Sequence, residues 1–135
     1  KTKSFNIVGF PYETPALFQE TVALNARLQP DSVIVGIFEP YPGTRLAEAC
    51  LKEGWLPADQ PDTWFLGRMD TALAMPAFPR RAILRAFRNF AYNVYKRRAP
   101  MRALFYKVYY SPLGERLVRL LAPVKPFLRR LVMGV

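Results

Sequence analysis

Apolar runs and a helical repeat alternate at the start of the chain. Residues 5–10 (FNIVGF) are mostly apolar and include β-branched Ile7 and Val8, a composition typical of a strand buried on both faces. Thr14 and Pro15 then indicate a helix start, because threonine is a good N-cap and proline fits the first helical position. The candidate core positions of this helix recur at the spacing of one face: Leu17, Thr21, Leu24 and Leu28. We expect this face to pack against a sheet.

The same order of elements then repeats. Residues 32–38 (SVIVGIF) form a second apolar run of strand length, and the helix between the two runs predicts that the strands are parallel. Thr44 is the expected N-cap of the next helix, which runs toward Glu53 and is closed by Gly54. The first part of the chain is therefore predicted to be α/β, with the order β-α-β-α.

Two loops follow the carboxyl ends of these strands. Residues 9–13 (GFPYE) and 39–44 (EPYPGT) each contain an acid, an aromatic residue and residues that stiffen or sharpen a turn. In parallel β/α folds, ligands bind at this edge of the sheet. The alternative is that the prolines and glycines only end strands and begin helices.

Composition limits the range of functions. The 135 residues are 51% hydrophobic, which is enough for one domain. Histidine is absent, and the single cysteine, Cys50, excludes an internal disulfide framework and is expected to behave as a small apolar group. The chain begins at Lys1 without a signal-peptide pattern, and it contains no apolar stretch long enough to span a bilayer. We expect a fragment of a longer, cytoplasmic protein.

The positive charge is concentrated in the second half. Up to Pro79 there are six basic and nine acidic residues, whereas from Arg80 onward there are fourteen basic residues and a single acid, Glu115. Residues 57–79 contain four prolines, which predicts an extended connection, with Trp64 and Phe65 packed against the protein rather than in a free linker. A helical stripe then follows, formed by Ile83, Phe87, Phe90 and Val94.

Three interpretations of the basic half remain open. Lys and Arg beside apolar faces favour an anionic membrane surface. The same charge could bind nucleic acid, with these tyrosines as stacking groups: Tyr92, Tyr95, Tyr106, Tyr109 and Tyr110. The helices could also simply cover other parts of the protein itself, with the charge as a solvated face. We favour the membrane and consider nucleic acid unlikely as a partner, because the tail, residues 115–135, combines its charges with Leu, Val and Phe.

Residues 5–14 (FNIVGFPYET) and 30–56 (PDSVIVGIFEPYPGTRLAEACLKEGWL) resemble the last two strand-loop-helix units of a radical SAM enzyme. The subgroup with a cobalamin-binding domain is the most similar. The resemblance implies residues 1–56 as the carboxyl end of a partial (β/α)6 barrel, 57–79 as the connection, and 80–135 as a basic helical extension. It also implies S-adenosylmethionine and a [4Fe-4S] cluster as cofactors, and perhaps a cobalamin outside this chain.

The resemblance also implies a set of cofactor-binding residues. Ile7 and Gly9 lie where the family's fifth strand contacts the adenine of S-adenosylmethionine, and Glu13 matches an acid that braces the loop by accepting backbone N–H groups. Phe38 and Glu39 end the sixth strand, beside the same adenine. The sequence departs from the family by having Phe5 and Tyr12 where glycine is often found.

The family's three cluster cysteines have no counterpart in this chain, so the fragment is expected to be inactive alone, with no catalytic residue and no metal ligand of its own. The implied partners are the N-terminal remainder of the parent enzyme, an apolar small-molecule substrate and an anionic membrane surface, at which the protein would be peripheral. The rival interpretation is a non-enzymatic, basic helical module that binds anionic membrane or nucleic acid.

Overall fold

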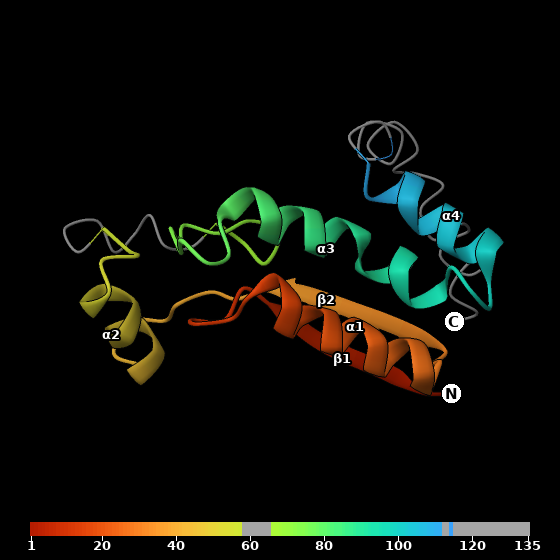
Figure 1. The fold of residues 1–135 in the computed structure, drawn as a ribbon, viewed down its shortest axis with the longest axis horizontal. Helices are drawn as coiled ribbons and strands as arrows, with labels where there is room; N and C mark the ends of the chain where they lie inside the picture. Colours follow the sequence, from red (N-terminus) through yellow and green to blue (C-terminus); the bar gives the residue numbers. More distant parts are fainter. Residues whose placement is uncertain (58–65, 112–113, 115–135) are drawn as a thin grey trace. The chain divides into compact units, whose positions relative to one another are not determined.

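The computed structural model describes residues 1–57, 66–111 and 114. The elements follow in the order β1 (Lys3–Val8), α1 (Pro15–Leu28), β2 (Ser32–Ile37), α2 (Arg45–Lys52), α3 (Arg80–Tyr95) and α4 (Pro100–Tyr109) (Figure 1). The predicted β-α-β-α order is thus present, and the barrel around it stays a prediction. No helix in the described ranges is long and apolar enough to cross a membrane.

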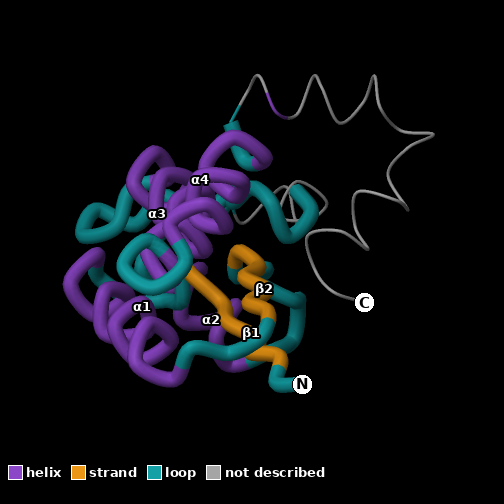
Figure 2. The backbone as a smooth tube through the Cα atoms, turned by 90° about the vertical axis from the view of Figure 1, so that its right-hand side faces the viewer, coloured by secondary structure: helices purple, strands orange, loops and turns teal. Residues whose placement is uncertain are grey.

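The strands β1 and β2 pair with each other in a two-stranded sheet (Figure 2). Ser32 donates its N–H to the carbonyl of Thr2, and Phe38 donates to the carbonyl of Val8 at 2.8 Å. At both ends of the sheet the residue number of the donor exceeds that of the acceptor by the same amount. The two strands therefore run in the same direction, as predicted. The predicted burial of β1 on both faces is wrong, because Phe5 is 73% and Ile7 47% exposed.

Both predicted helix starts are confirmed. The hydroxyl of Thr14 accepts the N–H of Leu17 at 3.2 Å, and the hydroxyl of Thr44 accepts the N–H of Ala47 at 3.3 Å. Each threonine therefore satisfies one of the N–H groups that the first turn of a helix leaves without a partner. At the other end of α2, Gly54 has a positive φ of 69°, as expected for a glycine that closes a helix.

The buried face of α1 differs from the prediction. Leu17, Leu24 and Leu28 are exposed, whereas Phe18, Val22 and Asn25 are buried. The helix itself was predicted correctly, but the face predicted to be buried is exposed. Apolar side chains lie on two sides of this helix, and the side that contains Phe18 is the buried one. In α3, by contrast, the predicted stripe is confirmed, and each of its members is at most 4% exposed: Ile83, Phe87, Phe90 and Val94.

The described residues cluster into two compact units. Four elements have residues in both units: β1, α1, β2 and α3. One unit contains residues 6–21 and 35–87. Its buried side chains include Val8, Phe18, Ile37, Phe38, Ala47, Cys50, Leu56, Leu73, Met75, Phe78, Ile83 and Phe87. Burial raises the pKa of the Cys50 thiol, which agrees with its predicted role as a small apolar group.

The other unit contains residues 1–5, 22–34 and those from 88 onward. In it, the buried Tyr95 hydroxyl donates to the carbonyl of Pro30 at 2.9 Å, and the rings of Tyr95 and Tyr106 stack at a centroid distance of 5.8 Å. The guanidinium of Arg102 lies 4.2 Å from the Tyr95 ring centroid and donates to the carbonyl of Asp31. Stacked aromatic rings thus join α3 to α4.

The connection that precedes α3 contains no helix or strand over residues 66–79, as predicted for this part. Trp64, Phe65 and the tail from 115 to 135 lie outside the described residues.

Candidate cofactor-binding rim

The loop after β1 forms a tight turn. Glu13 donates its N–H to the carbonyl of Phe10 at 2.9 Å, which closes a four-residue turn with Pro11 in its second position. Tyr12, in the third position, has a positive φ of 65°. Proline followed by a residue of positive φ defines a type II turn, in which glycine is normally found at the third position. Tyr12 therefore occupies a site for which tyrosine is conformationally unfavourable.

The Tyr12 side chain makes contacts that offset this cost. Its ring meets that of Trp55 edge-on at a centroid distance of 5.0 Å, and its hydroxyl donates to a carboxylate oxygen of Glu53 at 3.2 Å. These contacts join the first loop to the end of α2. These contacts give a physical reason for a tyrosine at a position where the family often has glycine, because glycine has no side chain with which to make them.

The loop after β2 contains the same kind of turn. Thr44 donates its N–H to the carbonyl of Tyr41 at 3.2 Å, with Pro42 in the second position and Gly43, at φ 77°, in the third. Here glycine adopts the positive φ without strain. Both loops therefore leave a parallel strand through a proline-containing type II turn and enter a helix with a threonine N-cap.

The two strand ends contact one another directly. Besides the hydrogen bond from Phe38 to Val8, the rings of Phe10 and Phe38 lie 5.0 Å apart between centroids. Phe38 is 8% exposed and Phe10 is 37% exposed. The edge of the sheet thus presents the partly exposed Phe10 ring above a buried Phe38 ring. We call residues 7–13 and 38–44 the rim.

Glu13 lies inside the first loop. One of its carboxylate oxygens accepts the N–H of Gly9 at 2.6 Å. The bracing of this loop by Glu13 is therefore present in the structure. Partial burial raises the pKa of the Glu13 carboxyl group, while hydrogen bonds from the backbone N–H groups of Gly9 and Phe10 act in the opposite direction.

Gly9 is buried and has a positive φ of 85°. A Cβ atom added to it would lie 3.2 Å from Cδ1 and 3.3 Å from Cγ2 of Ile83 in α3. The resemblance predicts that a cofactor approaches the backbone of Gly9 closely. On the side where a Cβ atom would lie, the group that approaches Gly9 is instead the Ile83 side chain of α3. Gly9 shapes the loop and allows α3 to approach it.

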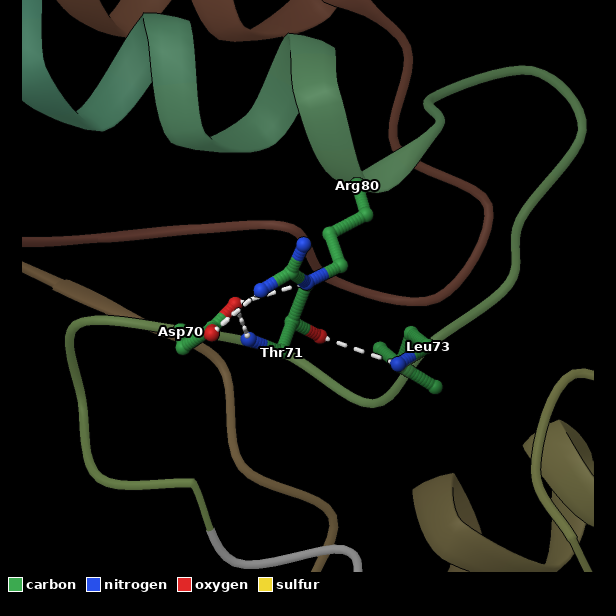
Figure 3. Close-up of polar contacts among 4 residues, drawn as sticks. All are labelled: Asp70, Thr71, Leu73 and Arg80. Carbon is green, nitrogen blue, oxygen red and sulfur yellow. Dashed lines mark hydrogen bonds and ion pairs between the residues drawn. The ribbon is translucent and has the colours of Figure 1, made fainter.

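The start of α3 is fixed close to Ile83. Arg80, the first residue of α3, donates from Nε to one oxygen of Asp70 at 2.9 Å and from a terminal nitrogen to the other at 2.5 Å (Figure 3). The same Asp70 carboxylate accepts the N–H of Thr71 at 2.8 Å, and the Thr71 hydroxyl accepts the N–H of Leu73 at 3.1 Å. The bidentate pair therefore ties the connection to the first turn of the helix that packs on Gly9.

The remaining predicted site residues lie at the rim in different environments. The side chain of Ile7 is 47% exposed, so it has an open surface beside the strand end. Glu39 is partly exposed, and one of its oxygens lies 3.5 Å from the Tyr41 hydroxyl, which donates to it. The structure thus brings Gly9, Glu13 and Phe38 into one connected loop system, with Ile7 and Glu39 beside it in the sequence.

Sequence reasoning missed a contribution from the connection. Ile37 donates its N–H to the carbonyl of Arg68 at 2.8 Å, and a Cβ atom added to Gly36 would lie 3.5 Å from Cβ of Arg68. Residues near Arg68 therefore run beside the end of β2. Gly36 within the second apolar run was the available signal, since glycine inside a strand marks close approach of another segment.

Two curated proteins share part of their sequence with this chain. They are probable threonylcarbamoyladenosine tRNA methylthiotransferases of Pyrococcus horikoshii and Pyrococcus abyssi, each 44% identical over 50 residues. The match covers 37% of this chain and 12% of each relative, so the chain spans a small part of their length. No family model matches the chain, and no solved structure matches it.

Methylthiotransferases are radical SAM enzymes, so the match supports a relationship to this family and an enzyme as the parent protein. It agrees with S-adenosylmethionine and a [4Fe-4S] cluster as the general cofactors of such a parent. It lends no support to the cobalamin-binding subgroup.

Proposed function

We propose that this chain forms the adenine-side wall of the S-adenosylmethionine site in a radical SAM enzyme. The observation that carries the proposal is the pair of proline-containing type II turns at the carboxyl ends of β1 and β2, joined through Phe38, Val8 and Phe10. Ligands of parallel β/α folds bind at this edge. The partial sequence match to radical SAM methylthiotransferases supports the same assignment.

The rim residues fit an adenine ring in chemistry. Ile7 offers an exposed aliphatic side chain, and Phe10 offers a partly exposed ring that packs on the buried Phe38 ring. Glu39 would face a polar edge of the ring. Gly9 and Glu13 would act indirectly by holding the loop in shape, since the N–H of Gly9 is already bound by Glu13 and its open side is filled by Ile83.

When bound together in the parent enzyme, S-adenosylmethionine and the cluster would supply a radical that abstracts hydrogen from substrate. This chain would contribute binding and orientation, and the remainder of the parent would hold the cluster. We further propose a cytoplasmic protein that acts on an apolar substrate. Cobalamin remains a prediction from the sequence resemblance alone, and the tRNA-directed activity named for the relatives is not carried over, given the small part of their length that matches.

The test is equilibrium binding of S-adenosylmethionine to the natural full-length protein that contains this chain. Ile7→Ser is expected to weaken binding at least about tenfold, because it removes most of an apolar contact surface. Leu46→Ser is the matched control, since Leu46 is 41% exposed in α2 and lies outside the rim. Equal affinities for wild type and the Ile7 variant, with both folded, would refute the assignment.

A non-enzymatic basic module is the second candidate. The observation that favours it is the charge of the described residues 88–111, which include six basic residues and no acid. A full-length protein that lacks S-adenosylmethionine binding altogether but binds anionic surfaces would support this candidate instead.

A further inference from the structure

One face of α4 is apolar and exposed. Met101, Leu104 and Val108 are 80%, 54% and 45% exposed. Their spacing of three and four residues places them on the same side of the helix, along about two turns. Ala103 and Tyr106, on another side, are buried. The helix therefore has an interior face that packs within its own unit and an exterior face with three large apolar side chains.

Positive charge surrounds this face. Between residues 88 and 111 the chain carries no acid, and its basic residues are Arg88, Lys96, Arg97, Arg98, Arg102 and Lys107. Lys96, Arg97 and Arg98 are exposed and directly precede α4, and Lys107 is exposed on the helix itself. An exposed apolar helix face bordered by Lys and Arg is complementary to an anionic lipid interface, which takes the apolar side chains among its acyl chains and the cations among its headgroups.

Two of the five candidate stacking tyrosines, Tyr95 and Tyr106, are not available to nucleic acid. Stacking on bases requires an accessible ring face. Tyr95 and Tyr106 are 2% and 4% exposed and stack on one another, so neither can receive a base. Arg102 is held over the Tyr95 ring and donates to the carbonyl of Asp31, so this cation is engaged within its own unit. The large hydrophobic side chains most exposed on α4 are Met101, Leu104 and Val108, none of which is aromatic.

We propose that α4 lies in the interface of an anionic bilayer, with Met101, Leu104 and Val108 inserted and Arg97 and Arg98 at the headgroups. This inference deepens the membrane interpretation of the basic half. It does not depend on S-adenosylmethionine binding, so either proposal can fail without the other.

Vesicle cosedimentation of the whole 135-residue chain is the first test. We expect binding to phosphatidylcholine vesicles that contain phosphatidylserine, and much weaker binding to phosphatidylcholine alone. The triple variant Met101→Ser, Leu104→Ser, Val108→Ser is expected to lower the partition coefficient at least about tenfold. Replacing Arg97 and Arg98 by glutamine should lower it roughly fivefold per charge.

The matched control replaces Leu24 and Leu28 of α1 by serine. These side chains are 46% and 66% exposed, so the control removes comparable apolar surface at another place. It should leave vesicle binding unchanged, and circular dichroism should show that all variants retain their helix content. Equal loss in the control and the triple variant would overturn the proposal, as would unchanged binding of the triple variant.

A fluorophore at position 104 gives a second readout. Cys50→Ala removes the buried native thiol, and Leu104→Cys then carries an environment-sensitive label. A blue shift that appears only with anionic vesicles supports insertion. A label that is already shielded without vesicles would mean that residues 115–135 or a second copy cover the face, and a shift produced by RNA but not by vesicles would mean a nucleic-acid surface. Either result would overturn the proposal.

Discussion

Replacing Gly9 by alanine should destabilise the fold through two separable effects. The first is conformational, because Gly9 has a φ of 85°, which costs a residue with a Cβ atom about 1–2 kcal/mol. The second is steric, because the new Cβ atom would lie 3.2 Å from Cδ1 of Ile83, a side chain that is fully buried and cannot easily move. Overpacking of this kind costs about 1–3 kcal/mol. We expect a total loss of about 2–5 kcal/mol.

Gly43 provides a control for the conformational part. Its φ is 77°, and a Cβ atom added to it would have no neighbour within 4 Å. Gly43→Ala should therefore cost only the conformational part, about 1–2 kcal/mol. Urea unfolding followed by circular dichroism measures both variants on the whole chain. Equal destabilisation by the two substitutions would refute the close packing of α3 on the loop.

The steric part can also be measured by its coupling to Ile83. Ile83→Val removes Cδ1, which is the atom nearest to the added Cβ. The double variant should be more stable than the sum of the single changes predicts, by about 1 kcal/mol. Strict additivity would contradict the assignment of the steric cost to Cδ1 of Ile83.

Three further substitutions test other parts of the rim and its support. Tyr12→Gly should be about 1 kcal/mol more stable than Tyr12→Ala by urea unfolding, because both lose the Trp55 contact but only alanine keeps the strained φ. Because burial raises the pKa of Glu13, the folded chain binds this proton more tightly than the unfolded chain. The resulting stability is present below the ordinary pKa and is lost as the pH rises through the raised value, and Glu13→Gln should remove that part of the pH dependence in urea titrations between about pH 4 and pH 7. Arg80→Lys should lower stability slightly in the same assay, and less at high salt, whereas Arg81→Lys, at an exposed neighbouring position, should be neutral.

Local signals in the sequence predicted the helix starts and the strongly amphipathic helix. Thr14 and Thr44 were identified as N-caps because a threonine before an apolar repeat has few other local roles. The stripe from Ile83 to Val94 was identified because Arg side chains flank it and leave one apolar side. In α1 apolar residues occur on two sides, so periodicity alone could not select Phe18 over Leu17 for the interior.

The features of the rim that depend on distant residues could not be predicted locally. The contact between Gly9 and Ile83 joins a loop to a helix far along the chain, and no spacing rule links them. Tyr12 gave no signal of its positive φ, because its type II turn normally contains glycine at that position. The pairing of Ile37 with Arg68 was missed because Gly36 indicates the close approach of another segment but not which segment approaches.

The coding sequence immediately before the codon of Lys1 tests the central claim most directly. If this chain is the adenine-side wall of a radical SAM site, the full-length reading frame should contain a CxxxCxxC set after its first strand, to hold the cluster that this chain has no residues to bind. A complete reading frame without such a set would contradict the assignment.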